Sequence, residues 1–240
     1  ITVGDTRTCN VYGSPKNAKI IFDRHVPIPM RDGVELMCNV FRPEAGDRHP
    51  AILCLAPYGK DSYPPDAQFA RIPNVGALPF SEFTGWEMPD PVYWCPNGYV
   101  VISADCRATN DCGGDHFAHF DPQMCRDFHD IIEWAAEQDW CDGNVGSNGV
   151  SYLAATQWLG ASENPPHLKA IMPWNAPADF YRESTHHGGI LQSFFHYLYV
   201  QRICADNSTS VTVKNTSPED LRRLIAELKS DPDIQINPEF

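Results

Sequence analysis

Residues 140–174 read WCDGNVGSNGVSYLAATQWLGASENPPHLKAIMPW, and this stretch decides the fold. A short strand leads through glycines to Ser151, residues 151–162 have the composition of a helix, and residues 167–174 form the next apolar strand. A strand followed by a helix and a second strand is the repeating unit of a parallel sheet with helices on its faces. The stretch therefore predicts an α/β fold.

The same alternation continues towards the N-terminus. Four further strands are predicted, over residues 19–28, 34–43, 50–58 and 98–105, and a helix over residues 126–140. The first two strands are expected to form a hairpin, because the turn between them contains Asp-Gly. The next two are short continuous apolar runs, which is typical of strands buried on both faces of a parallel sheet.

Composition changes along the chain divide it into three expected parts. Residues 1–18 mix Gly, Pro, Asn and Thr without a period, which indicates an arm, and residues 19–179 form the α/β core. Within this core, residues 62–96 are expected to be a long loop, and such loops are usually functional. Residues 180–240 are expected to be helical and distinct from the sheet, with a helix-start signal at residues 217–220.

The composition is that of a folded globular protein, with 240 residues of which 42% are hydrophobic. The 18 Lys and Arg residues against 31 Asp and Glu residues give a net charge of −13, which repels a nucleic-acid backbone. No apolar run approaches the roughly 20 residues that cross a bilayer. We therefore expect neither nucleic acid nor a membrane as a partner.

The nine cysteines are scattered without C-x-x-C pairs, so zinc-ribbon and thioredoxin-like sites find no support. Several, such as Cys54, lie in predicted core strands, where cysteine behaves as a small apolar residue. This favours a cytoplasmic protein. Secretion stays open as the alternative, because residues 207–209 and 215–217 are glycosylation sequons. No cofactor and no metal are expected.

Ser151 lies where a strand meets a helix, which is the context of a nucleophile elbow. A serine on that turn projects its hydroxyl above the edge of the sheet, and the crowded turn needs small neighbours. Those neighbours are Gly146, Gly149, Ala154 and Ala155. The strict G-x-S-x-G pattern fails, because Leu153 occupies its last position. On these residues alone, a serine that merely caps the following helix is an open alternative.

Together with three further blocks in the same order, residues 140–174 resemble the CocE/NonD hydrolases. This family includes cocaine esterase, the α-amino-acid ester hydrolases and the X-Pro dipeptidyl-peptidases of the S15 type. The further blocks are VPIPMRDGVELMCNVFRP, APYGK and Asp105-x-Arg107, and the resemblance runs from about residue 20 to residue 182. In the family pattern D-x-R-G-x-x-x-S-x-G, Ala108 and Cys112 replace the Gly and the Ser, whereas the last Gly is kept. We interpret this departure as drift within a structural turn.

The resemblance implies an α/β-hydrolase fold and the transfer of an acyl group from an ester or amide to water. It makes Ser151 the nucleophile and gives the oxyanion hole two donors, the Tyr152 N–H and the Tyr58 hydroxyl. It implies no cofactor and no metal. Without the resemblance, Tyr58 is an ordinary tyrosine at the end of a strand.

A serine nucleophile also needs a histidine and an acid, which follow it in this fold. The histidines after Ser151 are His167, His186, His187 and His196. His167 precedes the strand after the elbow, and the other three fall in what resembles the start of the family's helical cap. In the family, the acid and the histidine lie beyond that cap.

Two explanations of this incomplete triad are open. We expect a C-terminal fragment of the same polypeptide to supply the Asp and the His, because a sheet that stops near Trp174 leaves a hydrophobic edge. The alternative is a non-catalytic relative that acts as a binding or assembly subunit. A base improvised from the histidines in residues 186–196 is a third and remote option. The sequence is also compatible with a homo-oligomer.

Overall fold

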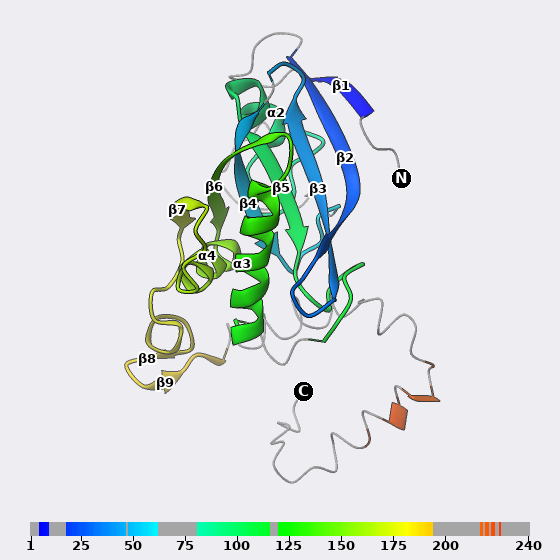
Figure 1. Ribbon diagram of the computed structural model, residues 1–240. Coiled ribbons are helices and arrows are strands. Elements are labelled where there is room, and N and C mark those ends of the chain that lie inside the picture. The colour runs from blue at the N-terminus through cyan, green and yellow to red at the C-terminus, as the bar shows by residue number, and fades with distance from the viewer. Residues whose placement is uncertain are drawn as a thin grey trace.

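A seven-stranded sheet forms the centre of the computed structural model, with strand order β1-β2-β3-β5-β4-β6-β7 (Figure 1). The structure describes residues 5–9, 18–46, 48–61, 81–115 and 120–193, and residues 217, 219, 220, 222, 223 and 226. The strands are β1 (Asp5–Cys9), β2 (Ala18–Pro29), β3 (Glu35–Pro43), β4 (His49–Ala56), β5 (Val100–Asp105), β6 (Cys141–Val150) and β7 (Leu168–Trp174). Strands β5, β4, β6 and β7 are parallel, and β1, β2 and β3 are antiparallel. The predicted α/β fold is confirmed.

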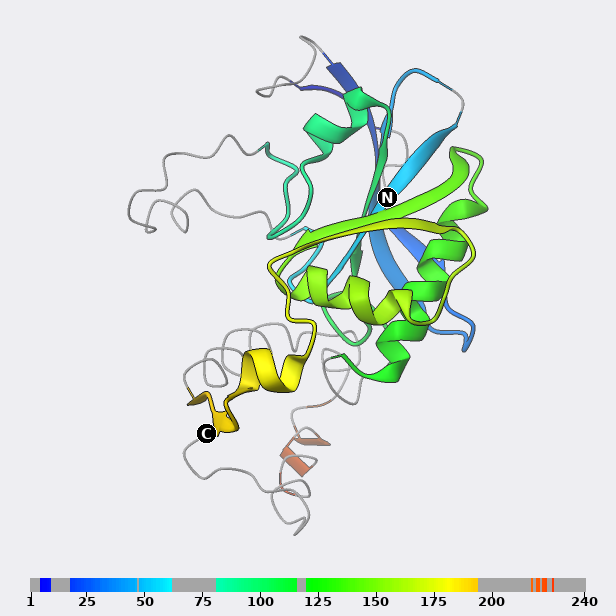
Figure 2. The same cartoon turned by 90° about the vertical axis from the view of Figure 1, so that its left-hand side faces the viewer.

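Helices α3 (Pro122–Ala136) and α4 (Tyr152–Ala161) lie side by side and cover one face of the parallel strands (Figure 2). Helix α3 begins four residues before the predicted position. The Asp121 carboxylate caps it by accepting a hydrogen bond of 2.8 Å from the Met124 N–H, and Pro122 takes the first helical position. Its predicted apolar stripe is buried, at Phe128, Ile131, Ile132 and Ala135.

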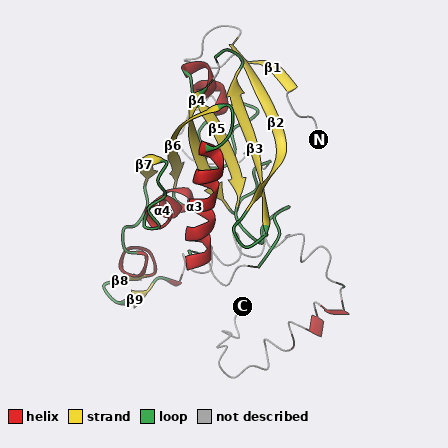
Figure 3. Cartoon of the chain, viewed as in Figure 1, coloured by secondary structure: helices red, strands yellow, loops and turns green. Residues whose placement is uncertain are grey.

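A smaller apolar cluster lies on the opposite face of the sheet. Alternate residues of β5 serve the two faces, so that Val100 and Ile102 join the large core and Val101 joins this cluster. Helix α2 (Pro91–Trp94) and the 3-10 turn η1 (Cys95–Asn97), which lie among the red segments at the top of Figure 3, contribute Val92 and Cys95 to this cluster. The predicted loop 62–96 therefore contains a short helix that was not predicted. Residues 62–80 of this loop lie outside the described residues.

The β2–β3 hairpin is confirmed. The Met30 N–H donates to the Val34 carbonyl over 2.8 Å, and Gly33 takes a φ of +84°, which favours glycine. The predicted arm over residues 1–18 includes strand β1, which pairs antiparallel with β2. Pairing with a neighbouring strand is a tertiary effect, and it overrides the weak pattern of this segment.

The described start of the predicted helical segment is not a long helix. A single π-helical turn, η2 (Tyr181–Thr185), leads into the paired strands β8 (His186–His187) and β9 (Ile190–Leu191). The intervening glycines, Gly188 and Gly189, have φ values of +62° and +83° and form the turn between β8 and β9.

Further along the chain, the predicted helix start at residues 217–220 is supported. The Ser217 hydroxyl accepts a hydrogen bond of 3.1 Å from the Asp220 N–H. No helix in the described ranges is long and apolar enough to cross a bilayer. The seven cysteines whose side chains are described are buried thiols.

Candidate active site

Ser151 occupies a strained turn between β6 and α4. Its φ of 57° and ψ of −113° are rarely adopted by a residue with a side chain. Its backbone is held on both sides: the N–H donates to the Trp174 carbonyl over 2.9 Å, and the carbonyl accepts from Ala154 and Ala155. The Ser151 hydroxyl makes no capping hydrogen bond to α4. The interpretation of this residue as a side-chain helix cap is therefore not supported.

The departure from the G-x-S-x-G pattern has a packing explanation. Leu153, in the last position of the pattern, is buried at the start of α4. A Cβ added to Gly149 would lie 2.4 Å from the Leu153 Cβ, which is far inside van der Waals contact. Gly149 therefore makes the room that Leu153 needs. At Gly146, an added Cβ would meet its nearest atom only at 3.4 Å.

The structure brings Tyr58 and Tyr152 together beside Ser151. Tyr58 follows the end of β4, and its ring lies edge-to-face against the Tyr152 ring with centroids 6.1 Å apart. Phe120 stacks on the same Tyr152 ring at 4.4 Å. All three predicted site residues thus lie at the carboxyl ends of neighbouring parallel strands, β4 and β6, where open α/β sheets bind ligands.

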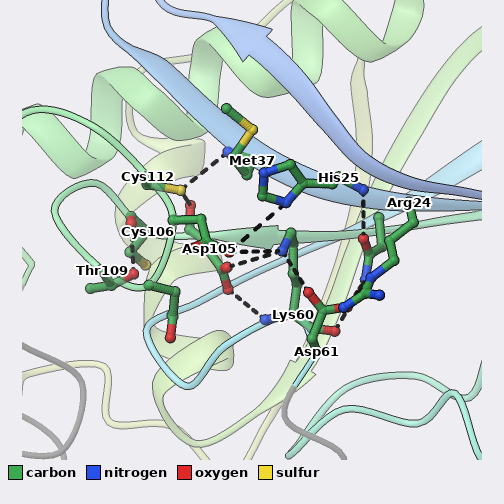
Figure 4. A network of polar contacts seen from close by, with 12 residues as sticks. Arg24, His25, Met37, Lys60, Asp61, Asp105, Cys106, Thr109 and Cys112 are labelled. Carbon is green, nitrogen blue, oxygen red and sulfur yellow. Dashed lines mark hydrogen bonds and ion pairs between the residues drawn. The ribbon is translucent and has the colours of Figure 1, made fainter. Parts of the chain in front are cut away.

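Two hydrogen bonds fix the loop that carries Tyr58. The Lys60 N–H donates to Asp105 Oδ1 over 2.6 Å, and the Lys60 carbonyl accepts from the Asn39 amide over 3.3 Å (Figure 4). The buried Lys60 ammonium lies 2.7 Å from Asp61 and 3.9 Å from Asp105 Oδ2. Burial raises the pKa of Asp105 to about 7, although the Lys60 charge acts to lower it. The loop is therefore anchored two residues after Tyr58.

The turn after β5 explains the other departures from the family pattern. Ala108 stands where the pattern has Gly, and it adopts a left-handed φ of 58°. The Cys112 thiol accepts a hydrogen bond from the Met37 N–H over 3.1 Å and donates to the Asp105 carbonyl over 3.4 Å. Ala108 and Cys112 thus both contribute to the geometry of the turn, which agrees with drift within a structural turn. Beside them, Arg107 binds the Asp127 carboxylate through two nitrogens.

Glu87 belongs to this site, although the sequence analysis did not identify it. Its carbonyl accepts a hydrogen bond of 3.2 Å from the N–H of Val150, the residue before Ser151. Its carboxyl group interacts with the Tyr58 hydroxyl, and burial raises its pKa to about 7. Burial, together with the nearby Glu87, raises the pKa of Tyr58 well above its usual range. The predicted loop also contains Asp66, Glu82 and Asp90, so no signal in the sequence singles out Glu87.

The described histidines that follow Ser151 in the chain contact groups other than the Ser151 hydroxyl. His167 Nδ1 is 2.7 Å from the Glu133 carboxylate, which ties the start of β7 to α3. His186 Nδ1 is 2.9 Å from the Thr185 hydroxyl, and His187 contacts the Glu183 carbonyl. Among the residues that the structure describes, none makes a hydrogen bond with the Ser151 hydroxyl. His196 lies outside the described residues.

Comparison with protein families identifies the chain. The family model described as X-Pro dipeptidyl-peptidase (S15 family) matches residues 32–229, which is more than half of the chain. The chain belongs to this family. The match to the S15 family includes the nucleophile elbow. It also includes all of the blocks on which the resemblance rests, except residues 26–31 at the start of the first block.

Individual relatives are hydrolases. The crystal structure of a CocE/NonD family hydrolase from Staphylococcus aureus is 39% identical, with a TM-score of 0.77, and covers 88% of this chain and 38% of that one. Cocaine esterase from Rhodococcus is 37% identical over 158 residues, which are 66% of this chain and 24% of that protein. An α-amino acid ester hydrolase, 24% identical with a TM-score of 0.57, shares the fold. The chain thus spans well under half the length of these S15 family relatives.

Proposed function

We propose that this chain is the nucleophile-bearing part of a serine hydrolase that cleaves a small-molecule ester or amide. Ser151 attacks the carbonyl carbon, and the Tyr58 hydroxyl and the Tyr152 N–H stabilise the tetrahedral oxyanion. The acyl group stays on Ser151 until water releases it. The family membership of the chain supports this reaction class, since its relatives include esterases as well as a dipeptidyl-peptidase family.

The backbone of Ser151 is the observation that carries the proposal. With φ at 57° and ψ at −113°, the residue lies outside the helix that it precedes, and its hydroxyl is not used to cap that helix. Strained residues persist only where the surrounding structure over-determines them, and they cluster at active sites. The neighbouring Tyr58 adds a hydroxyl at the same end of the sheet.

In this proposal, the acid and the histidine come from a C-terminal part of the same polypeptide that packs against β7. Strand β7 is an edge of the described sheet, and Met172 and Trp174 are 39% and 55% exposed. An apolar groove of about 290 Å³ lies over β4, β6 and β7 and is lined partly by Ile52 and Trp94. An open edge beside exposed apolar side chains favours a covering partner.

The test is covalent labelling of the hydrolase as it is purified, with a fluorophosphonate probe, followed by turnover of an activated ester. We expect Ser151 to be labelled, and Ser151→Ala to lower kcat by about 10⁴- to 10⁶-fold with an unchanged circular dichroism spectrum. Ser162→Ala, at the exposed end of α4, is the matched control and should keep full activity. A binding or assembly subunit predicts no label, and wild-type turnover by Ser151→Ala would end the proposal.

A further inference from the structure

We propose that Glu87 is a positioning residue of the oxyanion hole, whose protonated carboxyl group donates a hydrogen bond to the Tyr58 oxygen. This inference rests on the function proposed above. In it, the Tyr58 oxygen accepts from Glu87 while the Tyr58 proton is donated to the oxyanion. No bond is broken in either residue, and neither proton leaves its group, so Glu87 acts only through Tyr58.

The contacts of Glu87 join both halves of the candidate site. Its carboxyl group interacts with the Tyr58 hydroxyl, and its carbonyl accepts a 3.2 Å hydrogen bond from the Val150 N–H. Glu87 also has a φ of +62°, a backbone conformation that residues with a side chain rarely adopt. A residue is held in such a conformation when its surroundings require it, and here it places one residue against both the tyrosine and the elbow.

The surroundings of the carboxyl group favour its neutral form. The groups that face it are the Tyr58 hydroxyl, from the end of β4, and the Trp86 side chain, which donates a hydrogen bond. The Cys106 thiol, from the end of β5, faces Tyr58. Glu87 Oε2 is buried without a hydrogen-bond partner among the described residues, and none of their cations contributes to its pKa. Burial is the largest cause that raises this pKa to about 7.

The protonation state of Glu87 decides where the Tyr58 proton goes. A tyrosine hydroxyl has one proton to donate, and an ionised carboxylate can only accept. When Glu87 is ionised, it takes the Tyr58 proton in a charge-assisted hydrogen bond and competes with the oxyanion. When Glu87 is protonated, it donates to Tyr58 and that competition disappears. Because the pKa is raised, the productive form is present below about pH 7 and is lost as the pH rises through that value.

The experiment compares pH profiles of the assembled hydrolase, meaning this chain with its C-terminal part. The variant is Glu87→Gln, whose amide N–H donates to Tyr58 at every pH. Glu82→Gln, in the same loop and exposed, is the matched control. For an activated ester, wild-type and control kcat should fall about tenfold per pH unit above the Glu87 pKa, with KM unchanged. Glu87→Gln should match the wild type at low pH and exceed it about tenfold one unit above that pKa.

A second variant and a second readout keep the outcomes distinct. Glu87→Leu offers no donor, so its kcat should be several-fold lower than that of Glu87→Gln at all pH values. Infrared difference spectra of wild type minus Glu87→Gln should show a protonated carboxyl band that disappears near neutral pH, whether or not the enzyme turns over.

Parallel kcat profiles for wild type and Glu87→Gln, or the absence of that infrared band, would overturn the role of Glu87. Either result leaves the proposed function standing if Ser151→Ala abolishes turnover. Turnover that does not depend on Ser151 would overturn both proposals.

Discussion

Several single residues near the candidate site have a strained backbone, and three of them bear on the argument. Ser151, Glu87 and Ala108 have side chains and yet adopt φ values of 57°, 62° and 58°. Each such residue costs about 1–3 kcal/mol, which the packed core offsets. Ser151 and Glu87 are also joined through the Val150 N–H, which donates to the Glu87 carbonyl. At the scale of the residue, strain therefore marks the elbow and the loop that touches it.

The role of Tyr58 gives a prediction at this scale. Tyr58→Phe removes the hydroxyl aimed at the oxyanion and keeps the ring that packs edge-to-face on Tyr152. We expect kcat to fall about a hundredfold or more, equivalent to roughly 3 kcal/mol, with KM nearly unchanged and a lower melting temperature, because the buried Glu87 carboxyl group loses a hydrogen-bond partner. Steady-state kinetics and thermal unfolding of the assembled enzyme measure both quantities. A change in KM alone would make Tyr58 a substrate-binding residue instead.

At the scale of the element, capping residues and turns position the site. Asp121 caps α3, and Arg107, in the turn after β5, binds Asp127 of α3 and Asp32 in the β2–β3 turn. Asp105, the last residue of β5, anchors the Tyr58 loop through the Lys60 N–H. Strand β5 thus links the hairpin, the helix layer and the oxyanion side of the site.

Ala108, a left-handed residue in the turn after β5, gives a second prediction. Ala108→Gly should raise the free energy of unfolding by about 1 kcal/mol or less, because glycine adopts a φ of 58° without steric cost but loses more entropy on folding. Gly114→Ala is the matched opposite change. There φ is +76°, and an added Cβ would lie 2.8 Å from Arg107, so stability should fall. Chemical denaturation measures the free energy of unfolding of both variants. A lower stability of Ala108→Gly than of the wild type would contradict this prediction.

At the scale of the whole molecule, the sheet is covered unevenly. Helices α3 and α4 bury one face, whereas large apolar side chains stay exposed around β6 and β7. Trp158 and Trp174 are 47% and 55% exposed, and Val150 and Met172 more than a third. Exposed apolar side chains beside an open sheet edge favour a covering partner or create an aggregation hazard.

This uneven cover predicts how the chain behaves by itself. Expressed alone, residues 1–240 should aggregate or stay partly unfolded, because among the described residues β7 pairs only with β6 and its outer edge is open. In the hydrolase as purified, a C-terminal part should accompany the chain and place a histidine within hydrogen-bond reach of Ser151. Intact mass and size-exclusion light scattering measure this. A monodisperse, cooperatively unfolding and probe-reactive 26.9 kDa species without a companion would refute it.

The sequence by itself determined the order of strands β2 to β7 and of helices α3 and α4, the β2–β3 hairpin, and the position of Ser151 between β6 and α4. Apolar periodicity, the Asp-Gly turn and the small residues around the elbow are local signals, and local signals survive in one sequence. The tertiary structure alone decided the contact between Glu87 and Tyr58, the anchoring of Lys60 by Asp105, and the pairing of β1 with β2. The first two contacts join segments far apart in the chain, and burial rather than residue type raises the pKa of Glu87.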